Sequence, residues 1–281
     1  MLAKRLIAKL DIKGPNLVKG IHLEGLRVLG LPEDFAMHYY ENGIDEIIFQ
    51  DVVASLYGRN SLLDIISKTA KQIFVPLTVA GGIRSIDDIK NVLRSGADKV
   101  AINTAVVDNP ELINKLANTF GSSTITIAME VIKNNDEYKV YVNNGREETG
   151  KKLTDWIIEV QERGAGEIFL TSVDYEGTGN GYNIHLLDTI KNLVKVPLIF
   201  HGGASNISHI MSILERNEVD GASCSSMLHY GYLNAKKDTK AKIDSGNTEF
   251  ISKKNQFHKF GNINISKIKK DLYTHGCKIR V

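Results

Sequence analysis

The sequence predicts an α/β fold, a closed (β/α)8 TIM barrel, and three observations lead to this class. Short apolar runs alternate with amphipathic helical segments along most of the chain, as in a parallel sheet built from strand–helix units. The length of 281 residues suits one such barrel. Two segments repeat each other, because VPLTVAGGIRS (75–85) and VPLIFHGGASN (196–206) both run from a proline through an apolar strand to a glycine pair.

The expected strands are apolar runs that end in small or polar residues. They span 5–11, 46–51, 77–82, 99–104, 124–130, 167–174, 197–203 and 221–227. Between them lie helical segments such as 85–96, in which Ile86, Ile89 and Val92 recur on one face. Ser85 or Asp87 can cap the start of this helix. Eight strands with intervening helices place the active face at the carboxyl ends of the strands.

An internal repeat predicts that the barrel consists of two half-barrels. Glu46 and Glu167 each open a strand, and the interval between them equals the interval between Gly82 and Gly203. A repeat of four strand–helix units accounts for both matches. Chance likeness between two units is the alternative.

Three segments depart from this regular alternation. Residues 12–30 are too long and too glycine-rich for a simple connection, so we expect a flexible loop over the active face. Residues 131–150 predict a hairpin with a turn at 143–145. The lysine-rich stretch at about 234–262 is expected to be a polar insertion before the last helix (265–276), either solvated or docking a partner. The whole chain, 1–281, is expected to form one domain.

Composition excludes several classes of protein. With 42% hydrophobic and 24% charged residues, the chain has the balance of a soluble globular protein. The net charge of +2 gives no reason to expect nucleic acid. We expect no membrane span and no signal peptide, and therefore a cytoplasmic protein. Cys224 and Cys277 lack metal-binding spacing, which argues against a zinc site and against a disulfide framework. No metal and no cofactor is predicted.

Two carboxylates are candidates for acid–base chemistry. Asp11 ends the first strand and Glu130 ends the fifth, on opposite sides of the expected barrel mouth. Such a pair can take a proton at one group and give one at the other. The alternative is that both are ordinary polar residues at strand ends. Lys19, in the expected loop, could close over an anionic substrate or simply be solvated.

Two sets of residues at strand ends predict phosphate binding, because glycines let backbone amides approach an anion closely. Gly82, Asn103 and Thr104 end the third and fourth strands, and Gly203 and Ser225 end the seventh and eighth. Further glycines follow the sixth strand in EGTGNGYN (176–183). Sets on opposite sides of one mouth favour a substrate with a phosphate at each end.

The starts of four strands carry residues of alternating charge. These are Arg5, Glu46, Lys99 and Glu167, which could form a ring of ion pairs on the barrel floor. From spacing alone, routine ion pairing at the bottom of a barrel is the better interpretation.

Five motifs resemble one known family, the cyclase subunit of imidazole glycerol phosphate synthase. They are LVKG (17–20), GADKVAINTA (96–105), DWIIEVQERGAGEI (155–168), LTSVDYEGTGNGY (170–182) and HGGA (201–204). The resemblance implies that Asp11 is catalytic and Lys19 sits in a closing loop. It implies phosphate sites lined by Gly82, Asn103, Thr104, Gly177, Gly203 and Ser225. It also turns the floor ring into a gate through which ammonia enters from a glutaminase subunit at the N-terminal face of the barrel.

The chain departs from this family at the reaction end. Glu130 and Glu176 stand where the family has aspartates, Lys9 replaces a cysteine, and His201 replaces a small serine. With the segments 11–27 and 54–65, these departures resemble a divergent branch found with surface-polysaccharide genes. That branch is thought to pass ammonia to a third protein, which converts an acetamido group of a sugar into an acetamidino group.

Three functions are open, of which the first two follow from the resemblance and the third from the two expected phosphate sites. The first is this ammonia-delivering subunit, and whether the barrel itself would catalyse a step stays open. The alternative is the parent activity, an ammonia-dependent lyase that cleaves and cyclises a bis-phosphorylated ribulosyl aminoimidazole carboxamide in histidine biosynthesis. The third is an isomerase of a related phosphorylated sugar, which leaves the gate unexplained.

Overall fold

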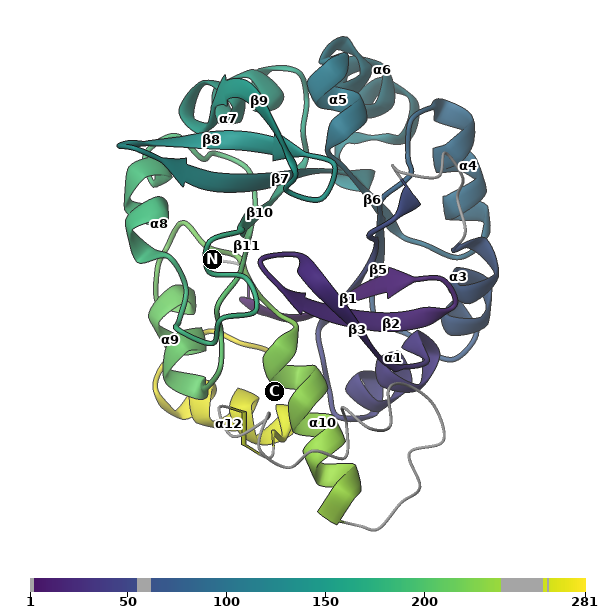
Figure 1. Ribbon diagram of the computed structural model, residues 1–281, viewed down its shortest axis with the longest axis vertical. Coiled ribbons are helices and arrows are strands. Elements are labelled where there is room, and N and C mark those ends of the chain that lie inside the picture. The colour runs from purple at the N-terminus through teal and green to yellow at the C-terminus, as the bar shows by residue number, and fades with distance from the viewer. Residues whose placement is uncertain (1–2, 55–61, 239–259, 262) are drawn as a thin grey trace.

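The computed structural model describes residues 3–54, 62–238, 260–261 and 263–281. Within these residues, parallel strands close into a barrel, which confirms the predicted fold class (Figure 1). The barrel strands, in spatial order, are β1 (Arg5–Lys13), β4 (Glu46–Asp51), β5 (Leu77–Ala80), β6 (Lys99–Ile102), β7 (Ile125–Asn134), β10 (Glu167–Ser172), β11 (Leu198–His201) and β12 (Gly221–Cys224).

The strand register brings equivalent residues to one level of the barrel. Ile7 of β1 lies opposite Glu46 of β4, and Arg5 lies opposite Gly221 of β12, which closes the barrel. On β7 and β10, Thr126 lies opposite Glu167. Because all barrel strands run in parallel, their carboxyl ends meet at one face, as the sequence predicted.

Helices surround the barrel as an outer layer (Figure 1). They are α1 (Pro32–Glu41), α3 (Leu63–Ala70), α4 (Ile86–Arg94), α5 (Thr104–Asp108), α6 (Glu111–Phe120), the 3-10 helix η1 (Ser122–Thr124), α7 (Leu153–Glu162), α8 (Ile184–Ile190), α9 (Ile207–Leu214), α10 (Ser226–Asp238) and α12 (Ile265–Thr274). Helix α4 begins with a capping box, since the Ser85 hydroxyl accepts a bond from the Asp88 amide and the Asp88 carboxylate accepts one from the Ser85 amide. Ser85, rather than Asp87, is therefore the cap.

The segment expected to be a flexible loop is instead an ordered antiparallel sheet, so that prediction was wrong. Strand β1 continues beyond the barrel, and β2 (Asn16–Ile21) and β3 (Glu24–Gly30) follow it in antiparallel pairing. Leu17 of β2 and Leu29 of β3 are buried in the large apolar cluster, which fixes this sheet to the barrel.

The predicted hairpin at 131–150 is confirmed and is longer than expected. Strand β7 extends beyond the barrel and pairs with β8 (Glu137–Val142), which pairs with β9 (Glu147–Lys152). The turn between β8 and β9 places Asn143, Asn144 and Gly145 at positive φ. The two three-stranded extensions, β1–β3 and β7–β9, lie on opposite sides of the barrel opening (Figure 1). Each begins on the first strand of a predicted half-barrel, in agreement with the two-fold repeat.

The interior of the barrel is layered. An apolar inner layer lies at mid-height and consists of Ile7, Ile48, Ala80, Ala101, Ala128, Phe169 and Ile199. A larger apolar cluster fills the space between the strands and the surrounding helices. Charged residues occupy the levels below and above the inner layer, so the apolar layer separates two polar ends.

Two other expectations concern the chain as a whole. Among the described residues, no helix is both long enough and apolar enough to cross a membrane. Residues 234–238 of the predicted polar insertion belong to α10, whereas 239–259 and 262 lie outside the described residues. The single-domain interpretation of 1–281 and the cytoplasmic location stay predictions.

Candidate active site

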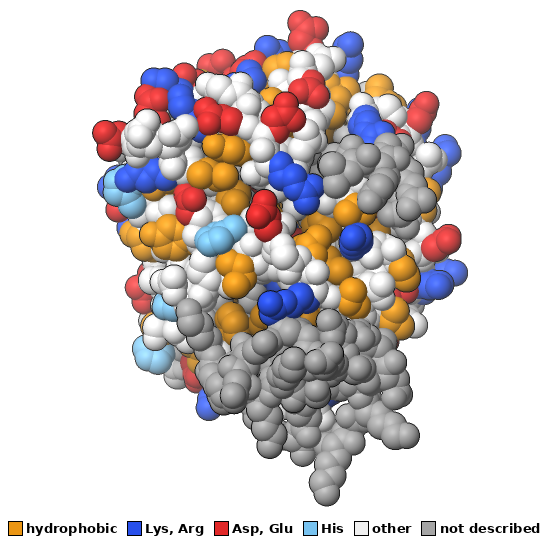
Figure 2. Space-filling view, viewed as in Figure 1, with side chains coloured by type: hydrophobic (Ala, Val, Ile, Leu, Met, Phe, Trp, Pro, Cys, Tyr) orange, Lys and Arg blue, Asp and Glu red, His pale blue; other side chains and the backbone are white. Residues whose placement is uncertain are grey.

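The two predicted catalytic carboxylates lie at the mouth of the barrel, where β1 and β7 pass into their antiparallel extensions. Asp11 pairs with Val18 of β2, and Glu130 pairs with Tyr141 of β8. Both side chains are buried. Figure 2 shows this face of the molecule, on which side chains fill the opening that the ribbon leaves between the two extensions.

Asp11 is held ionised by two lysines. Lys9 forms an ion pair with one carboxylate oxygen, and Lys19 Nζ lies 3.4 Å from the other. Burial alone would raise the pKa of Asp11, but Lys9 and Lys19 outweigh burial and lower it. Asp11 therefore carries a negative charge at neutral pH.

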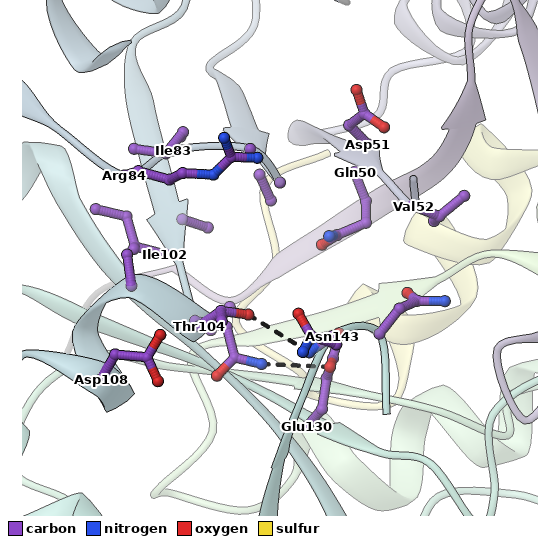
Figure 3. Close-up of a pocket in the computed structure, with 18 residues that line it drawn as sticks. Gln50, Asp51, Val52, Ile83, Arg84, Ile102, Thr104, Asp108, Glu130 and Asn143 are labelled. Atoms are coloured by element: carbon purple, nitrogen blue, oxygen red, sulfur yellow. Dashed lines mark hydrogen bonds between the residues drawn. The ribbon is translucent and has the colours of Figure 1, made fainter. Parts of the chain in front are cut away.

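Glu130 has the opposite character. Burial raises the pKa of Glu130 to about 7, although Lys9 and a hydrogen bond from the Gly145 amide (2.8 Å) work against this rise. Asn103 Nδ2 donates to the same carboxylate at 3.3 Å (Figure 3). Near neutral pH the Glu130 carboxyl can both give and accept a proton, as a general acid–base group must.

Lys19 is not in a loop. It lies in β2, is fully buried, and forms ion pairs with Glu176 and Asp11. Burial would lower the pKa of Lys19, but Glu176 and Asp11 raise it above its usual value. Burial would raise the pKa of Glu176, but Lys19 holds it well below its usual range. Lys19 thus fastens β2 to the barrel mouth by a buried ion pair.

The first predicted phosphate set lines an open cavity of about 310 Å3. Gly82, Asn103 and Thr104 lie on its wall, together with Glu130 and with Arg84. Sequence reasoning missed Arg84, although it directly follows the Gly81-Gly82 repeat. Figure 3 shows the cavity between the strand ends, with Arg84 across from Glu130. Its volume is suited to a small molecule, and a guanidinium beside glycine amides is suited to an anion.

The second predicted set surrounds almost no space. Gly177, Gly203 and Ser225 line a cavity of about 10 Å3, room for no more than one water-sized molecule. A side-chain carbon on Gly177 would lie 2.6 Å from the carbonyl oxygen of Gly20, so β2 packs directly on this glycine. Of the two predicted sets, the first therefore lines an anion-sized cavity in the described part of the chain, and the second does not.

The four charged residues of the barrel floor form a closed ring. Arg5 contacts Glu46 at 2.8 Å and Glu167 at 2.7 Å. Lys99 contacts the same two glutamates at 3.4 Å and 3.1 Å. Thr78 and Thr126 donate hydrogen bonds to the glutamates from within the barrel. The ring that the sequence offered is therefore present, and in it both glutamates are buried and each is shared between two cations. Its role as a gate, rather than as routine ion pairing, stays a prediction.

The four family departures lie close to the mouth. Lys9 pairs with Asp11, and Glu176 pairs with Lys19. His201 Nε2 lies 3.8 Å from Glu176 Oε1. Lys9 also acts on Glu130, where it opposes the rise in pKa that burial causes. The substituted residues therefore form one connected charged cluster with Asp11.

These features define a class of protein: a (β/α)8 barrel that has a buried carboxyl of raised pKa beside an anion-sized cavity at one end and an ion-pair ring at the other. The family model described as histidine biosynthesis protein matches residues 5–234. The chain belongs to this family, and the relatives described below are named as HisF subunits of imidazole glycerol phosphate synthase.

Three relatives carry that name. The HisF subunit of Legionella pneumophila is 52% identical over 204 residues, which cover 72% of this chain and 96% of the relative. That of Bacillus cereus (strain Q1) is 45% identical over 250 residues, or 89% and 99% of the two chains. That of Natranaerobius thermophilus is 40% identical over 237 residues, or 84% and 94%. None of these names supports the expected surface-polysaccharide role.

Proposed function

We propose that the chain is the cyclase subunit of an imidazole glycerol phosphate synthase. In this role it takes ammonia and a bis-phosphorylated ribulosyl aminoimidazole carboxamide, and gives imidazole glycerol phosphate for histidine synthesis. The observation that carries the proposal is the difference in protonation between Asp11 and Glu130 at one barrel mouth. The names of the relatives favour this function over sugar amidination.

The two carboxyls have separate tasks in this reaction. Ammonia adds to a carbonyl carbon, and Glu130, with a pKa of about 7, carries protons from the added nitrogen to the carbonyl oxygen, which leaves as water. Glu130 regains from the nitrogen each proton that it gives to the oxygen. Asp11 has a depressed pKa and is a weak base, so its task is electrostatic. It stabilises the positive charge that develops on the attacking nitrogen.

The cavity of about 310 Å3 at the first predicted phosphate set holds one phosphate end of the substrate. Gly82 and Thr104 offer backbone and hydroxyl donors, and Arg84 supplies positive charge. The phosphate at the other end needs the site at Gly177, Gly203 and Ser225, which β2 covers in this structure. Substrate binding therefore requires β2 and Lys19 to move away from Glu176.

Ammonia would come from a glutaminase on the opposite face. The floor ring of Arg5, Glu46, Lys99 and Glu167 lies at the strand starts, and an apolar groove of about 380 Å3 adjoins it. The groove is lined by Phe74, Pro76 and Asp98, and Asp98 directly precedes Lys99 of the ring. Phe74 is 80% exposed, which suits a residue that a partner covers.

The test is a cyclase assay on the purified chain with ammonium salt, which needs no glutaminase. Turnover of the ribulosyl bis-phosphate that falls at least a hundredfold in Glu130→Gln supports the proposal. A folded sample without turnover contradicts it.

A second candidate function is the ammonia-delivering subunit for acetamido-to-acetamidino conversion of a surface sugar by a third protein. The closed second phosphate site favours it, since a chain that only conducts ammonia needs no bis-phosphate pocket. The same assay separates the two functions, because this candidate predicts no turnover of the ribulosyl substrate.

A further inference from the structure

Lys9 is a buried lysine that lies on β1 between the apolar inner layer and the barrel mouth. Because side chains alternate along a strand, Lys9 and Asp11 point to the same side of β1 as Ile7 of the inner layer. Lys9 is 3% exposed, and its ammonium group forms an ion pair with one oxygen of Asp11. A buried ammonium group is costly to desolvate, and the proposed reaction gives this one no task.

The charge of Lys9 acts on titratable groups from every side of the mouth. These are Asp11 on β1, Glu130 on β7, Glu176 after β10, His201 on β11 and His229 on α10, and Lys19 of β2 shares Asp11 with it. Burial raises the pKa of each carboxyl, and Lys9 opposes that rise. Burial lowers the pKa of both histidines, and Lys9 lowers it further, so both rings are neutral at neutral pH.

Two charged groups act on Glu130, and they are the two members of the Lys9–Asp11 ion pair. Lys9 lowers the pKa of Glu130 and Asp11 raises it. The hydrogen bonds from the Gly145 amide and from Asn103 Nδ2 come from neutral donors. Glu130 therefore faces an ion pair, and without Lys9 it would face the negative charge of Asp11 alone.

The two lysines on Asp11 differ in how the fold holds them. Lys9 belongs to the parallel ladder of the barrel, where it lies opposite Ile48 of β4. Its backbone carbonyl also accepts a hydrogen bond from Ser225 Oγ at 2.9 Å. Lys19 belongs to β2, outside the barrel, and β2 has to move for the second phosphate to bind. Lys9 is therefore the cation that remains with Asp11 when β2 moves.

We propose that Lys9 is a positioning residue of the cyclase reaction, which acts through Asp11 and Glu130, an inference that rests on the proposed function. It stays paired with Asp11 when β2 withdraws Lys19, so Asp11 keeps its negative charge throughout the reaction. It also shields Glu130 from that charge, so that Glu130 can release its proton near neutral pH. Lys9 needs no contact with the substrate for either task.

The experiment is a pH titration of the full chain, labelled with 13C at the side-chain carboxyl carbons of glutamate. The Glu130 resonance is the one that disappears in Glu130→Gln, and its midpoint in the wild type should lie near pH 7. In Lys9→Met we expect the midpoint to rise by about one pH unit, because Asp11 then acts unopposed. Lys9→Gln, which keeps a polar group beside Asp11, should act in the same direction, and Lys9→Arg should restore the wild-type midpoint.

Two controls remove other buried lysines. Lys269 of α12 pairs with Asp45 at 2.6 Å, beside the start of β4, so Lys269→Met should keep the wild-type midpoint. The double variant Lys19→Met/Glu176→Leu removes the second cation of Asp11, and it should also keep the midpoint because Lys9 remains. An unchanged midpoint in folded Lys9→Met or Lys9→Gln overturns the inference. A shift of equal size in the double variant overturns the assignment to Lys9.

Turnover gives a second readout. In Lys9→Met, kcat/KM for the ribulosyl substrate should lie about tenfold below wild type at pH 6 and approach wild type at pH 9, since one pH unit changes the ionised fraction of Glu130 about tenfold. A loss of the same size at both pH values would indicate a merely structural role and overturn the inference. The titration needs no substrate. A wild type that is inactive but shows the expected midpoints therefore contradicts the proposed function, whereas an active one with equal midpoints contradicts only the role of Lys9.

Discussion

Lys19 of β2 and Glu176, which follows β10, form an ion pair at the barrel mouth although 157 positions separate them in the sequence. Both side chains are at most 1% exposed. Glu176 also accepts a hydrogen bond from the Leu23 amide at 3.2 Å, and its own backbone carbonyl accepts one from the His22 amide at 2.9 Å. This glutamate therefore holds both the strand β2 and the turn that follows it.

Removing the negative charge of Glu176 should destabilise the protein. In Glu176→Gln the buried Lys19 loses its nearer carboxylate and keeps Asp11, at 3.4 Å, as an ion-pair partner. We expect a loss of about 3 kcal/mol in the free energy of unfolding at neutral pH. Urea unfolding measures it. The double variant Lys19→Met/Glu176→Leu removes both charges and should recover most of the loss. A double variant as unstable as Glu176→Gln would show that the charges do not act as a pair.

The same pair sets an acid limit on stability. The pKa of Glu176 is lowered in the folded state, so its contribution is fully present above the unfolded pKa. It is lost as the pH falls below about 4.3, toward the lower folded-state value. The stability difference between wild type and Glu176→Gln should therefore shrink on acidification. Unfolding curves at a series of acidic pH values give this difference, and a constant value would contradict the pairing.

Glu130 should act in the opposite direction and in another pH range. Its folded-state pKa of about 7 lies above the usual glutamate value, so the folded chain binds the proton more tightly. Stability is therefore lost as the pH rises from about 4.3 through 7, by about 3 kcal/mol. Glu130→Gln cannot ionise, and its stability should change less over this range. Thermal unfolding at pH 5 and pH 8 compares the two proteins. An equal pH dependence would place the Glu130 pKa near its ordinary value.

The barrel itself could be predicted because its signals are local. Apolar strands, glycine pairs and helix caps such as Ser85 each depend on neighbouring residues, and their repetition gives the strand count. The four residues of the floor ring could be assigned to one end of the barrel, because they stand at strand starts and the starts of parallel strands meet at the same end. The sequence could offer the closed ring only as one possibility, because ring formation depends on how the side chains of Arg5 and Lys99 point within the barrel.

The mouth was predicted less well, because its contacts join distant parts of the chain. The glycines of 12–30 suggested flexibility, yet β2 is fixed by Glu176 and by the close approach of Gly20 to Gly177. The closed state of the second phosphate site follows from the volumes of Glu176 and His201 and from this approach. No local pattern contains that information. Arg84 was missed because an arginine after a glycine pair has no distinctive spacing.

The floor ring should control the transfer of ammonia. In Lys99→Ala each glutamate loses one of its two cations, and the ring opens between Glu46 and Glu167. With a glutaminase partner, we expect glutamine hydrolysis to continue while the fraction of ammonia recovered in product falls severalfold. Arg5→Ala should act in the same direction. Measuring glutamate and product in one reaction gives the ratio.

A surface lysine provides the control for this ratio. Lys90 pairs with Asp87 at 3.4 Å on an exposed face of α4, so Lys90→Ala should leave the ratio unchanged. Turnover of Lys99→Ala with ammonium salt should stay close to wild type, because external ammonia can reach the mouth directly. An unchanged ratio in Lys99→Ala would count against a gate.

Docking of the glutaminase should depend on Phe74. This ring is 80% exposed beside a groove that ends at Asp98, next to Lys99 of the ring. Its removal in Phe74→Ala costs little in the free chain, since the ring is in water already, but removes apolar contact in a complex. We expect affinity for the partner to fall at least tenfold, as measured by titration calorimetry.

Ile158→Ala on α7 is the control, because Ile158 is also an exposed hydrophobic residue, and this variant should bind the partner normally. Equal affinities for wild type and Phe74→Ala would move the docking site away from this groove. Ammonium-driven turnover should be the same in all three proteins, because Phe74 lies at the strand starts and the acid–base pair at the strand ends.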